Sequence, residues 1–364
     1  MKKQQKTDNP IQKNLNLGSK PFIQVPKTVQ KDGSSIGGKS HKNDIPPASL
    51  PLNNVICSFG KLNKIELIDR SCGIKNGPVF LTILQNWESE AVIGFYVSYH
   101  QPCAITLLCS LRHALSRKRD FHRIYPNIQN DWPRPRMIDT LVVKDRLNFR
   151  SSYLDNALLE TGTTVRYSSV ISSRTAESMI DDLNYFISCK AKRRKSSPPK
   201  ASYTPADLDH MLNKYFVDGF NAGFLLKLDA SPIQAYESAI EQISLPFHPP
   251  QDQIDMALCI TEYRHLTPKG IRYQGLHYKC PDLYFEYLQN LDTIAVFKVM
   301  PWDLSRIFVE TDKGLLEVPA EMSAYTLGLS LDQHRATLRA MRRKWFNNKN
   351  RYSDRATKLD PKPA

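Results

Sequence analysis

One acidic residue stands where a strand that should be buried comes to its end. Residues 140–143 read TLVV, a β-branched apolar run, and the chain continues into Lys144 and Asp145. The carboxyl end of a buried strand is where many α/β folds hold a metal ion, and a carboxylate is a ligand for two-metal phosphoryl transfer. Asp145 is therefore a candidate metal ligand, and the alternative is that it is only the polar end of a strand.

Two basic runs contain the residue types that follow a phosphate backbone. The run 190–195 reads KAKRRK, and the run 339–351 reads RAMRRKWFNNKNR, in which aromatic residues stand among the cations. Lysine and arginine bind nucleic-acid phosphates, and an aromatic ring can stack on a base. A solvated charged surface is the alternative. The candidate DNA-binding residues are Lys192, Arg193, Arg194, Lys195, Arg342, Arg343 and Lys344.

The charge of the whole chain favours a polyanionic partner. The chain has 364 residues and a formal net charge of +14. The excess is concentrated near the ends, with nine Lys against three Asp in 1–50 and nine Lys or Arg against two Asp in 339–364. Such a charge most often indicates nucleic-acid binding, although solubility alone is the alternative.

Cysteine usage and hydropathy predict a protein of the reducing interior of the cell. The seven cysteines form no CxxC pair and no Cys/His zinc spacing, and the basic start of the chain has no apolar stretch of a signal peptide. The most apolar stretch, 91–111, is interrupted by His100, Gln101 and Pro102, which indicates a strand followed by a helix rather than a membrane span. We expect a cytoplasmic protein without membrane contact; the bacterial, nucleoid-associated location that we also expect is implied by the family resemblance described below.

The elements that must position Asp145 alternate between strands and helices. The first two strands, 63–69 and 77–84, are predicted to be joined by a turn, and Gly162 ends the helix that follows Asp145. The predicted strands are 63–69, 77–84, 91–98, 140–143 and 163–169. The predicted helices are 103–118, which follows the third strand; 151–162, which follows the fourth; and 175–189, which follows the fifth.

A different pattern begins after Pro249 and Pro250. Short strands with tight turns follow one another, which is typical of a small β-barrel. A basic helix capped by Ser330 is predicted to close the chain. The predicted strand regions are 270–278, 292–299, 306–311 and 315–320, and the predicted helix is 330–346.

The order of elements before residue 190 is that of an RNase H-like fold, and several local sequence segments resemble those of the Mu/TnsB/TniA-type transposases. The clearest match is "KGIRYQGLHY", "VFKVMPWDLSRIFVETDKGLLEVP" and "GLSLDQHRATLRA", which is similar to the Mu transposase C-terminal domain and the helix after it. Upstream, "GPVFLTIL" and "AVIGFYVSYHQP" resemble strands of the family's core. The resemblance covers about residues 55–340 and lacks the helix-turn-helix region that precedes the core in the family.

This resemblance implies the fold class and the domains. The expected fold is an α/β RNase H-like core, a mixed sheet with flanking helices, followed by a helical linker and a small all-β barrel. The expected domains are 1–50, a disordered basic N-terminal segment; 51–190, the integrase-type core; 191–250, a basic linker and helices; 251–325, the Mu-transposase-like C-terminal β-barrel; and 326–364, a basic C-terminal helix and tail.

The resemblance also implies a catalytic site. Enzymes of this family cut and join DNA with two divalent ions, Mg²⁺ or Mn²⁺, held by two Asp and one Glu. Asp145 matches the second Asp, and Glu177 matches the Glu because an asparagine follows it seven residues later. The position of the first Asp aligns with Ser58, which cannot replace a charged ligand. Asp69 and Glu66 are the nearby acids that could supply the first carboxylate.

Further departures surround the same site. The family's Asp-Asn-Gly after the fourth strand is Asp145-Arg146-Leu147, and the family's Asp-x-Tyr-Ser-Arg turn is replaced by QNWESE at 85–90. These changes predict a DNA-binding protein of DNA transposition or integration with lost or weakened strand-transfer chemistry. Two alternatives stay open: an active transposase that uses Asp69 or Glu66, and a basic regulatory DNA-binding protein derived from a transposase.

The resemblance to these transposases also implies three partners. They are DNA, an AAA+ ATPase that contacts the tail 340–364, and a homo- or hetero-oligomer with a full-length transposase. Mg²⁺ or Mn²⁺ is the expected cofactor of an active enzyme, and no cofactor is expected otherwise.

Overall fold

The structure is a computed structural model that describes most of the chain between residues 53 and 345. The predicted segment 1–50 and the linker residues 191–200 lie outside the described residues, and the predicted domain boundaries stay predictions. The described residues are 53–63, 65–69, 74–75, 77–169, 179–187, 201–241, 248–291, 293–343 and 345.

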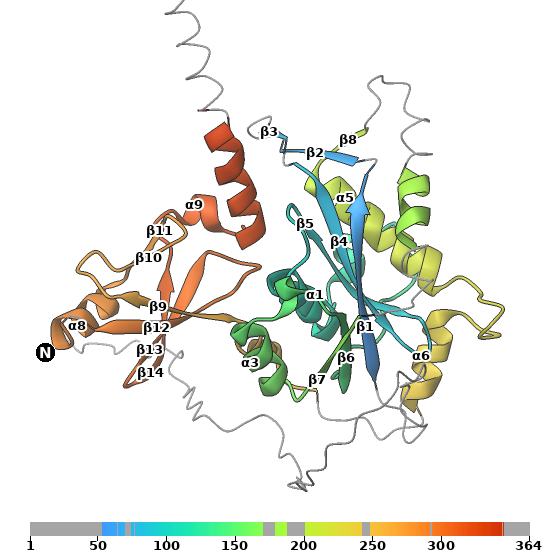
Figure 1. Cartoon of the computed structure of the whole chain (residues 1–364), viewed down its shortest axis with the longest axis horizontal. Helices are drawn as coiled ribbons and strands as arrows, with labels where there is room; N and C mark the ends of the chain where they lie inside the picture. Colours follow the sequence, from blue (N-terminus) through green and yellow to red (C-terminus); the bar gives the residue numbers. More distant parts are fainter. Residues whose placement is uncertain are drawn as a thin grey trace, which may run out of the picture.

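A five-stranded mixed sheet is the centre of the first half of the molecule (Figure 1). Its strand order is β5-β4-β1-β6-β7; β1, β4 and β5 pair antiparallel, while β6 pairs parallel with both β1 and β7. Val55 and Cys57 in β1 are at most 1% exposed, as expected for a central strand covered on its faces. The strands are β1 (Asn54–Leu62), β4 (Val79–Asn86), β5 (Val92–Ser98), β6 (Thr140–Lys144) and β7 (Thr164–Ser168).

The predicted hairpin of 63–69 with 77–84 is wrong. The antiparallel partner of β4 is β1, with Ser58 opposite Ile83. Residues Ile65–Asp69 do form a strand, β2, but it pairs with β3 (Ile74–Lys75) and β8 (Ala201–Tyr203) in a separate three-stranded sheet. Strand β1 takes the central position, where helices cover both of its faces.

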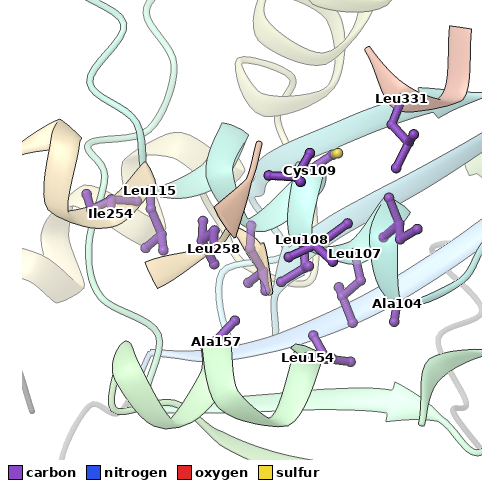
Figure 2. Close-up of a cluster of buried hydrophobic side chains, with 14 of the residues drawn as sticks. Ala104, Leu107, Leu108, Cys109, Leu115, Leu154, Ala157, Ile254, Leu258 and Leu331 are labelled. Carbon is purple, nitrogen blue, oxygen red and sulfur yellow. The ribbon is translucent and has the colours of Figure 1, made fainter. Parts of the chain in front are cut away.

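Helix α1 (Ala104–Leu115) packs on one face of this sheet. Gly94 in β5 permits the close approach, since a Cβ there would lie 2.8 Å from the Cβ of Ala114 and 2.9 Å from the carbonyl oxygen of Ser110. Figure 2 shows Leu107 and Leu108 of α1 on the side of α3 (Ser152–Glu160), whose Leu154 and Ala157 belong to the same buried cluster. The apolar character of 103–118 correctly predicted a helix, and residues 104–111 of α1 are all buried, so its first two turns are covered on every side.

The other face of the sheet is covered by the helix that includes residues 179–187. A Cβ at Gly60 would lie 2.5 Å from Cδ1 of Ile180, so only glycine fits without a shift of that side chain. Helix α5 (Pro205–Lys214) and the π-helix η2 (Tyr215–Asn221) extend the same core through Leu212 and Phe216. Position 60 of β1 therefore faces this helix rather than α1.

The second half contains a four-stranded antiparallel sheet in the order β14-β13-β12-β9. A hairpin of β10 and β11 turns at Gln274 and Gly275, both with positive φ, and Tyr278 bridges to Ala320 beside β14. The predicted fold class, a mixed sheet with flanking helices followed by a separate all-β region, is confirmed. The elements here are β9 (Ile260–His265), β10 (Ile271–Tyr273), β11 (Leu276–Tyr278), β12 (Ile294–Val299), β13 (Arg306–Thr311), β14 (Gly314–Pro319) and the helices α7 (Gln251–Ala257), α8 (Pro281–Gln289) and α9 (Ser323–Thr326).

A C-terminal helix, residues 331–343, joins the two halves. Asp332 accepts the backbone N–H of Tyr99 at 2.6 Å, and Arg339 donates to the carbonyl oxygen of the same residue at 3.3 Å. On its other side, His334 lies 2.9 Å from the carbonyl oxygen of Gln274 in the β10–β11 turn. The helix is therefore fastened both to the end of β5 and to the C-terminal sheet region.

Within the described part of the chain, none of the helices has the length and apolar character needed to cross a membrane.

Candidate functional site

Asp145 lies directly after the last residue of β6. Its backbone N–H donates to the carbonyl oxygen of Ser168 at 2.9 Å, which extends the parallel pairing of β6 with β7 by one bond. A short 3₁₀ turn, Leu147–Phe149, then leads to Ser151, which caps α3 by accepting the N–H of Leu154 at 3.4 Å. Asp145 thus stands at the carboxyl end of a parallel strand, as the sequence predicted.

The carboxylate of Asp145 is engaged by a neighbouring cation. Nε and Nη2 of Arg150 donate to Oδ1 of Asp145 at 3.1 and 3.0 Å. The side chains of Asp145 and Arg150 are 44% and 54% exposed, so the pair adds little to stability, but it places a positive charge on Oδ1, one of the two oxygens that Asp145 offers to a metal ion. The Arg150 guanidinium also lies 4.6 Å from the ring centre of Tyr167 in β7. The sequence analysis did not identify Arg150, whose only signal was a cation in the turn after Asp145.

A second cation next to Asp145 covers an aromatic ring of the central strand. The guanidinium of Arg146 lies 4.7 Å from the ring centre of Phe59, and Phe59 contacts Phe149 at a ring distance of 5.4 Å. Two arginines on aromatic rings therefore flank the end of β6. Such pairs combine cation–π attraction with exposed guanidinium groups that can bind phosphate.

Ser58 lies one strand away from Asp145, in β1. The parallel register sets Cys57 beside Val143, so Ser58 is level with Lys144, one residue before Asp145. Side chains alternate along a strand, so Ser58 shares the face of Gly60, which packs against Ile180. Ser58 therefore faces the helix at 179–187, whereas the carboxylate of Asp145 is held by Arg150 on the side of Tyr167.

The two other acids considered for the first metal ligand lie in a different sheet. Glu66 and Asp69 belong to β2, where the backbone of Asp69 is paired with Ile74. Figure 1 shows β2 and β3 beyond the carboxyl end of β1, while β6 pairs with the amino-terminal half of β1. The side chains of Glu66 and Asp69 lie outside the description, as does the whole of Glu177, so their assignment as ligands stays a prediction.

Comparison with known proteins identifies two transposase domains. The family model described as "TnsB C-terminal domain" matches residues 63–181, and that described as "Mu transposase, C-terminal" matches residues 255–317. The chain belongs to the Mu/TnsB-type transposase–integrase family. The resemblance inferred from the wording of the sequence is confirmed.

Solved structures of retroviral proteins are similar to this transposase-family chain at low identity. A chain of the simian T-cell lymphotropic virus intasome in complex with PP2A regulatory subunit B56 gamma is 11% identical, with a TM-score of 0.35, over 75% of this chain and 80% of that chain. The catalytic core domain of BIV integrase is 9% identical, with a TM-score of 0.29, over 52% of this chain and 97% of that chain. No curated protein matches.

Family members that join DNA depend on divalent metal ions, and the described residues of this chain do not provide the ligands of such a site. No group of three or more His, Cys, Asp or Glu side chains that could hold a metal ion occurs among them. At the end of β6 the described donors are the carboxylate of Asp145, already paired with Arg150, and the hydroxyl of Ser58, which faces elsewhere. Two ions about 4 Å apart need several convergent carboxylates, so this donor set does not fit them.

The predicted DNA-binding residues are only partly described. Arg342 and Arg343 are exposed on the C-terminal helix. Lys344 and the run from Lys192 to Lys195 lie outside the described residues. Their role in binding DNA stays a prediction.

Two of the basic residues that line a large groove at the end of α1, Arg112 and Lys118, already have structural partners. The groove has a volume of about 1250 Å³ and lies between α1, α5, α7 and Trp302. Arg112 donates to both carboxylate oxygens of Asp255 in α7 at 2.9 and 3.2 Å and lies 4.7 Å from the ring centre of Trp302. Burial lowers the pKa of Lys118 to about 7, and its ammonium donates to the carbonyl oxygen of His113 at 2.6 Å. These two cations fasten α1 to its surroundings.

Proposed function

We propose that this chain is a DNA-binding component of a transposition or integration assembly in which two-metal strand transfer is lost or weakened. The observation that carries the proposal is that the carboxylate of Asp145 is paired with Arg150. On the neighbouring central strand, level with Lys144, the position of the family's first Asp is occupied by Ser58. The family membership supports the DNA-related role.

The chemistry needs more negative charge than the described residues at the end of β6 supply. One ion must activate the attacking hydroxyl and the other must stabilise the leaving oxygen, so both have to be held at fixed positions. Ser58 supplies a neutral oxygen, and an ion at Oδ1 of Asp145 would have to displace Arg150, which donates two hydrogen bonds to that atom. A guanidinium on a carboxylate forms a charge-assisted hydrogen bond, which competes with a cation for the same oxygen.

The same residues favour contact with DNA without cutting it. Arg146 and Arg150 are exposed cations held over Phe59 and Tyr167 by ring contacts, so their positions are restrained before DNA arrives. Phosphate contacts of this kind position DNA and carry little sequence information. We therefore propose that binding is largely electrostatic and that Arg342, Arg343 and the basic runs add to it.

Two assays test the proposal together. Strand transfer on pre-cleaved DNA ends with Mg²⁺ or Mn²⁺ should be absent, while fluorescence anisotropy with duplex DNA should report binding that weakens steeply as salt rises. The double variant Arg146→Ala/Arg150→Ala should weaken binding, and Asp145→Ala should not. The control Arg264→Ala removes an exposed arginine of the C-terminal sheet and should leave binding unchanged.

Two outcomes would overturn the proposal in different ways. Robust joining that disappears in Asp145→Ala would establish an active transposase, and Asp69→Ala and Glu66→Ala would then identify the remaining ligand. Nanomolar binding to one sequence that survives high salt would favour the alternative of a regulatory DNA-binding protein.

We also propose an AAA+ ATPase and a full-length transposase as protein partners, on the basis of the family's domain order. The tail 340–364 is the proposed ATPase contact. This chain should capture a co-encoded ATPase in a pull-down, and deletion of 345–364 should abolish the capture. Unchanged capture would contradict the proposed contact.

A further inference from the structure

Helix α8 exposes an apolar face that the other described residues leave uncovered. Leu283 is buried beneath it, but Tyr284, Phe285, Leu288 and Leu291 are 46%, 59%, 51% and 66% exposed. Tyr284 and Leu288 lie four residues apart and form one stripe on α8, with Phe285 beside it, and Leu291 follows just after the end of the helix. Contiguous exposed apolar side chains of this kind mark interaction sites on folded proteins.

The surface around α8 is preformed. Cys280 accepts the N–H of Leu283 at the start of the helix, Pro281 occupies the first turn, and the rings of Tyr284 and Tyr287 stack at 6.4 Å. A cavity of about 350 Å³ adjoins the helix, lined in part by Cys280, Leu283 and Tyr284. A partner side chain could enter this cavity without a rearrangement of α8.

Helix α8 itself carries only negative charge, and the Lys279 that lines the adjoining cavity is already paired with Glu321. Asp282 and Glu286 are the charged residues of α8, and residues 280–297 contain no Lys, Arg or His. A partner that matches α8 should therefore combine large apolar side chains with positive charge.

The end of the C-terminal helix has these properties. Met341 and Trp345 are 52% and 58% exposed and lie four residues apart, which puts them on one side of a helix. Arg342 and Arg343 are exposed beside them, and no acidic residue occurs from 333 to 353. The apolar stripe and the charge of this segment are complementary to those of α8.

The two surfaces cannot meet within one molecule. The start of the C-terminal helix is fixed by Asp332 and Arg339 on Tyr99 and by His334 near Gln274. In Figure 1, α8 and the upper end of the C-terminal helix lie at well-separated places on the molecule. The helix would have to leave its buried site to reach α8 of its own chain.

We propose that α8 of one molecule binds the end of the C-terminal helix of a second copy of this chain, through Met341 and Trp345 on the apolar face and Arg342 on Glu286. Different surfaces meet in such a contact, so it is heterologous, and each dimer keeps one free α8 and one free helix end. Association can therefore continue to larger oligomers or close into a ring. The contact does not depend on the proposed DNA-binding function.

Sedimentation velocity of the full chain, freed of nucleic acid by nuclease treatment, tests this contact. The wild type should show concentration-dependent oligomers that high salt weakens. Phe285→Glu/Leu288→Glu and Met341→Ala/Trp345→Ala should each be monomeric, while the control Leu226→Glu, at a residue that is 91% exposed elsewhere, should associate like the wild type. Far-UV circular dichroism and a melting curve should show that each variant is folded.

Mixing the two variants provides the decisive observation. The α8 variant keeps a normal helix end and the helix-end variant keeps a normal α8, so their mixture should form 1:1 dimers and nothing larger. Charge reversal gives a second check: Glu286→Arg should weaken association, and adding Arg342→Glu in the same chain should restore part of it. A monomeric wild type, association that requires DNA, unchanged association of the variants or a monomeric mixture would each overturn the proposal.

Discussion

Two aspartates, Asp145 just after β6 and Asp332 on the C-terminal helix against the end of β5, have basic partners but opposite environments. Asp145 follows β6 and is 44% exposed beside Arg150. Asp332 is 2% exposed, accepts the N–H of Tyr99 just after β5, and lies 3.1 Å from Nε2 of His100. Burial raises the pKa of Asp332, with His100, Arg335 and Arg339 opposing that shift.

The difference shows which parts of the molecule the fold requires. An exposed ion pair is solvated before and after folding, so its members can change with little effect on stability. A buried carboxylate that satisfies a backbone N–H cannot be removed without leaving that group unpaired. Catalytic positions of this family can therefore change while the fold is retained.

Of the substitutions that test this contrast, Asp332→Ala should cause the largest loss of stability. The substitution leaves the Tyr99 N–H and His100 without their carboxylate inside the joint between the two halves. We expect a loss of about 3 kcal/mol in the free energy of unfolding, measured by urea denaturation. Asp332→Asn keeps an acceptor and should lose less. A loss no larger than that of Asp145→Ala would contradict the contrast between the two sites.

The second prediction applies the same contrast to two cations, Lys118 and Arg150. The pKa of folded Lys118 is lowered to about 7 by burial, so the folded protein releases this proton more readily than the unfolded chain. Stability should therefore rise as pH increases from about 7 towards the ordinary lysine pKa near 10.5. Because part of the Lys118 side chain reaches solvent, we expect a rise of only about 2 kcal/mol.

The control for this pH effect is Lys118→Met, which keeps most of the side-chain volume and cannot titrate. Its free energy of unfolding should lack the wild-type rise between neutral and alkaline pH. Arg150→Met, at the exposed ion pair, should keep it. A wild-type profile that is flat over this range would show that Lys118 is solvated like an ordinary surface lysine.

A smaller effect is expected at the start of the C-terminal helix. Ser330 accepts the N–H of Gln333 at 3.2 Å, and the Gln333 side chain accepts the N–H of Ser330 at 3.0 Å. Ser330→Ala removes one half of this reciprocal cap and should cost about 1 kcal/mol by urea denaturation. Ser330→Asp, which can still accept the N–H, should retain most of the stability, and an equal loss in both variants would indicate a role other than capping.

The smallest effect should be that of Asp145→Ala. Its partner Arg150 is exposed and can return to water, so the free energy of unfolding should change by less than about 0.5 kcal/mol. The melting temperature and the urea midpoint should both match the wild type. A large loss would mean that Asp145 supports the β6–α3 turn, in which case its retention would have a structural reason.

Local sequence patterns determined which segments form helices and strands. The helix 103–118, the strand ending at Lys144 and the cap at Ser330 were all predicted correctly, because each depends on residues within a few positions of one another. The fold class could also be inferred from wording that matches the transposase domains. The amphipathic segment at α8, by contrast, was not recognised as a helix, because its exposed aromatic residues obscure the helical period.

Only the tertiary structure decided how those segments combine. The sequence could not show that β1 rather than β2 pairs with β4, because that choice depends on which strand can be covered by helices on both sides. Nor could it show that Arg150 reaches back to Asp145, or that Asp332 is buried against Tyr99, 233 residues earlier in the chain. Local periodicity records which face of an element is apolar, whereas partners are selected by packing and by the need to satisfy buried polar groups over the whole chain.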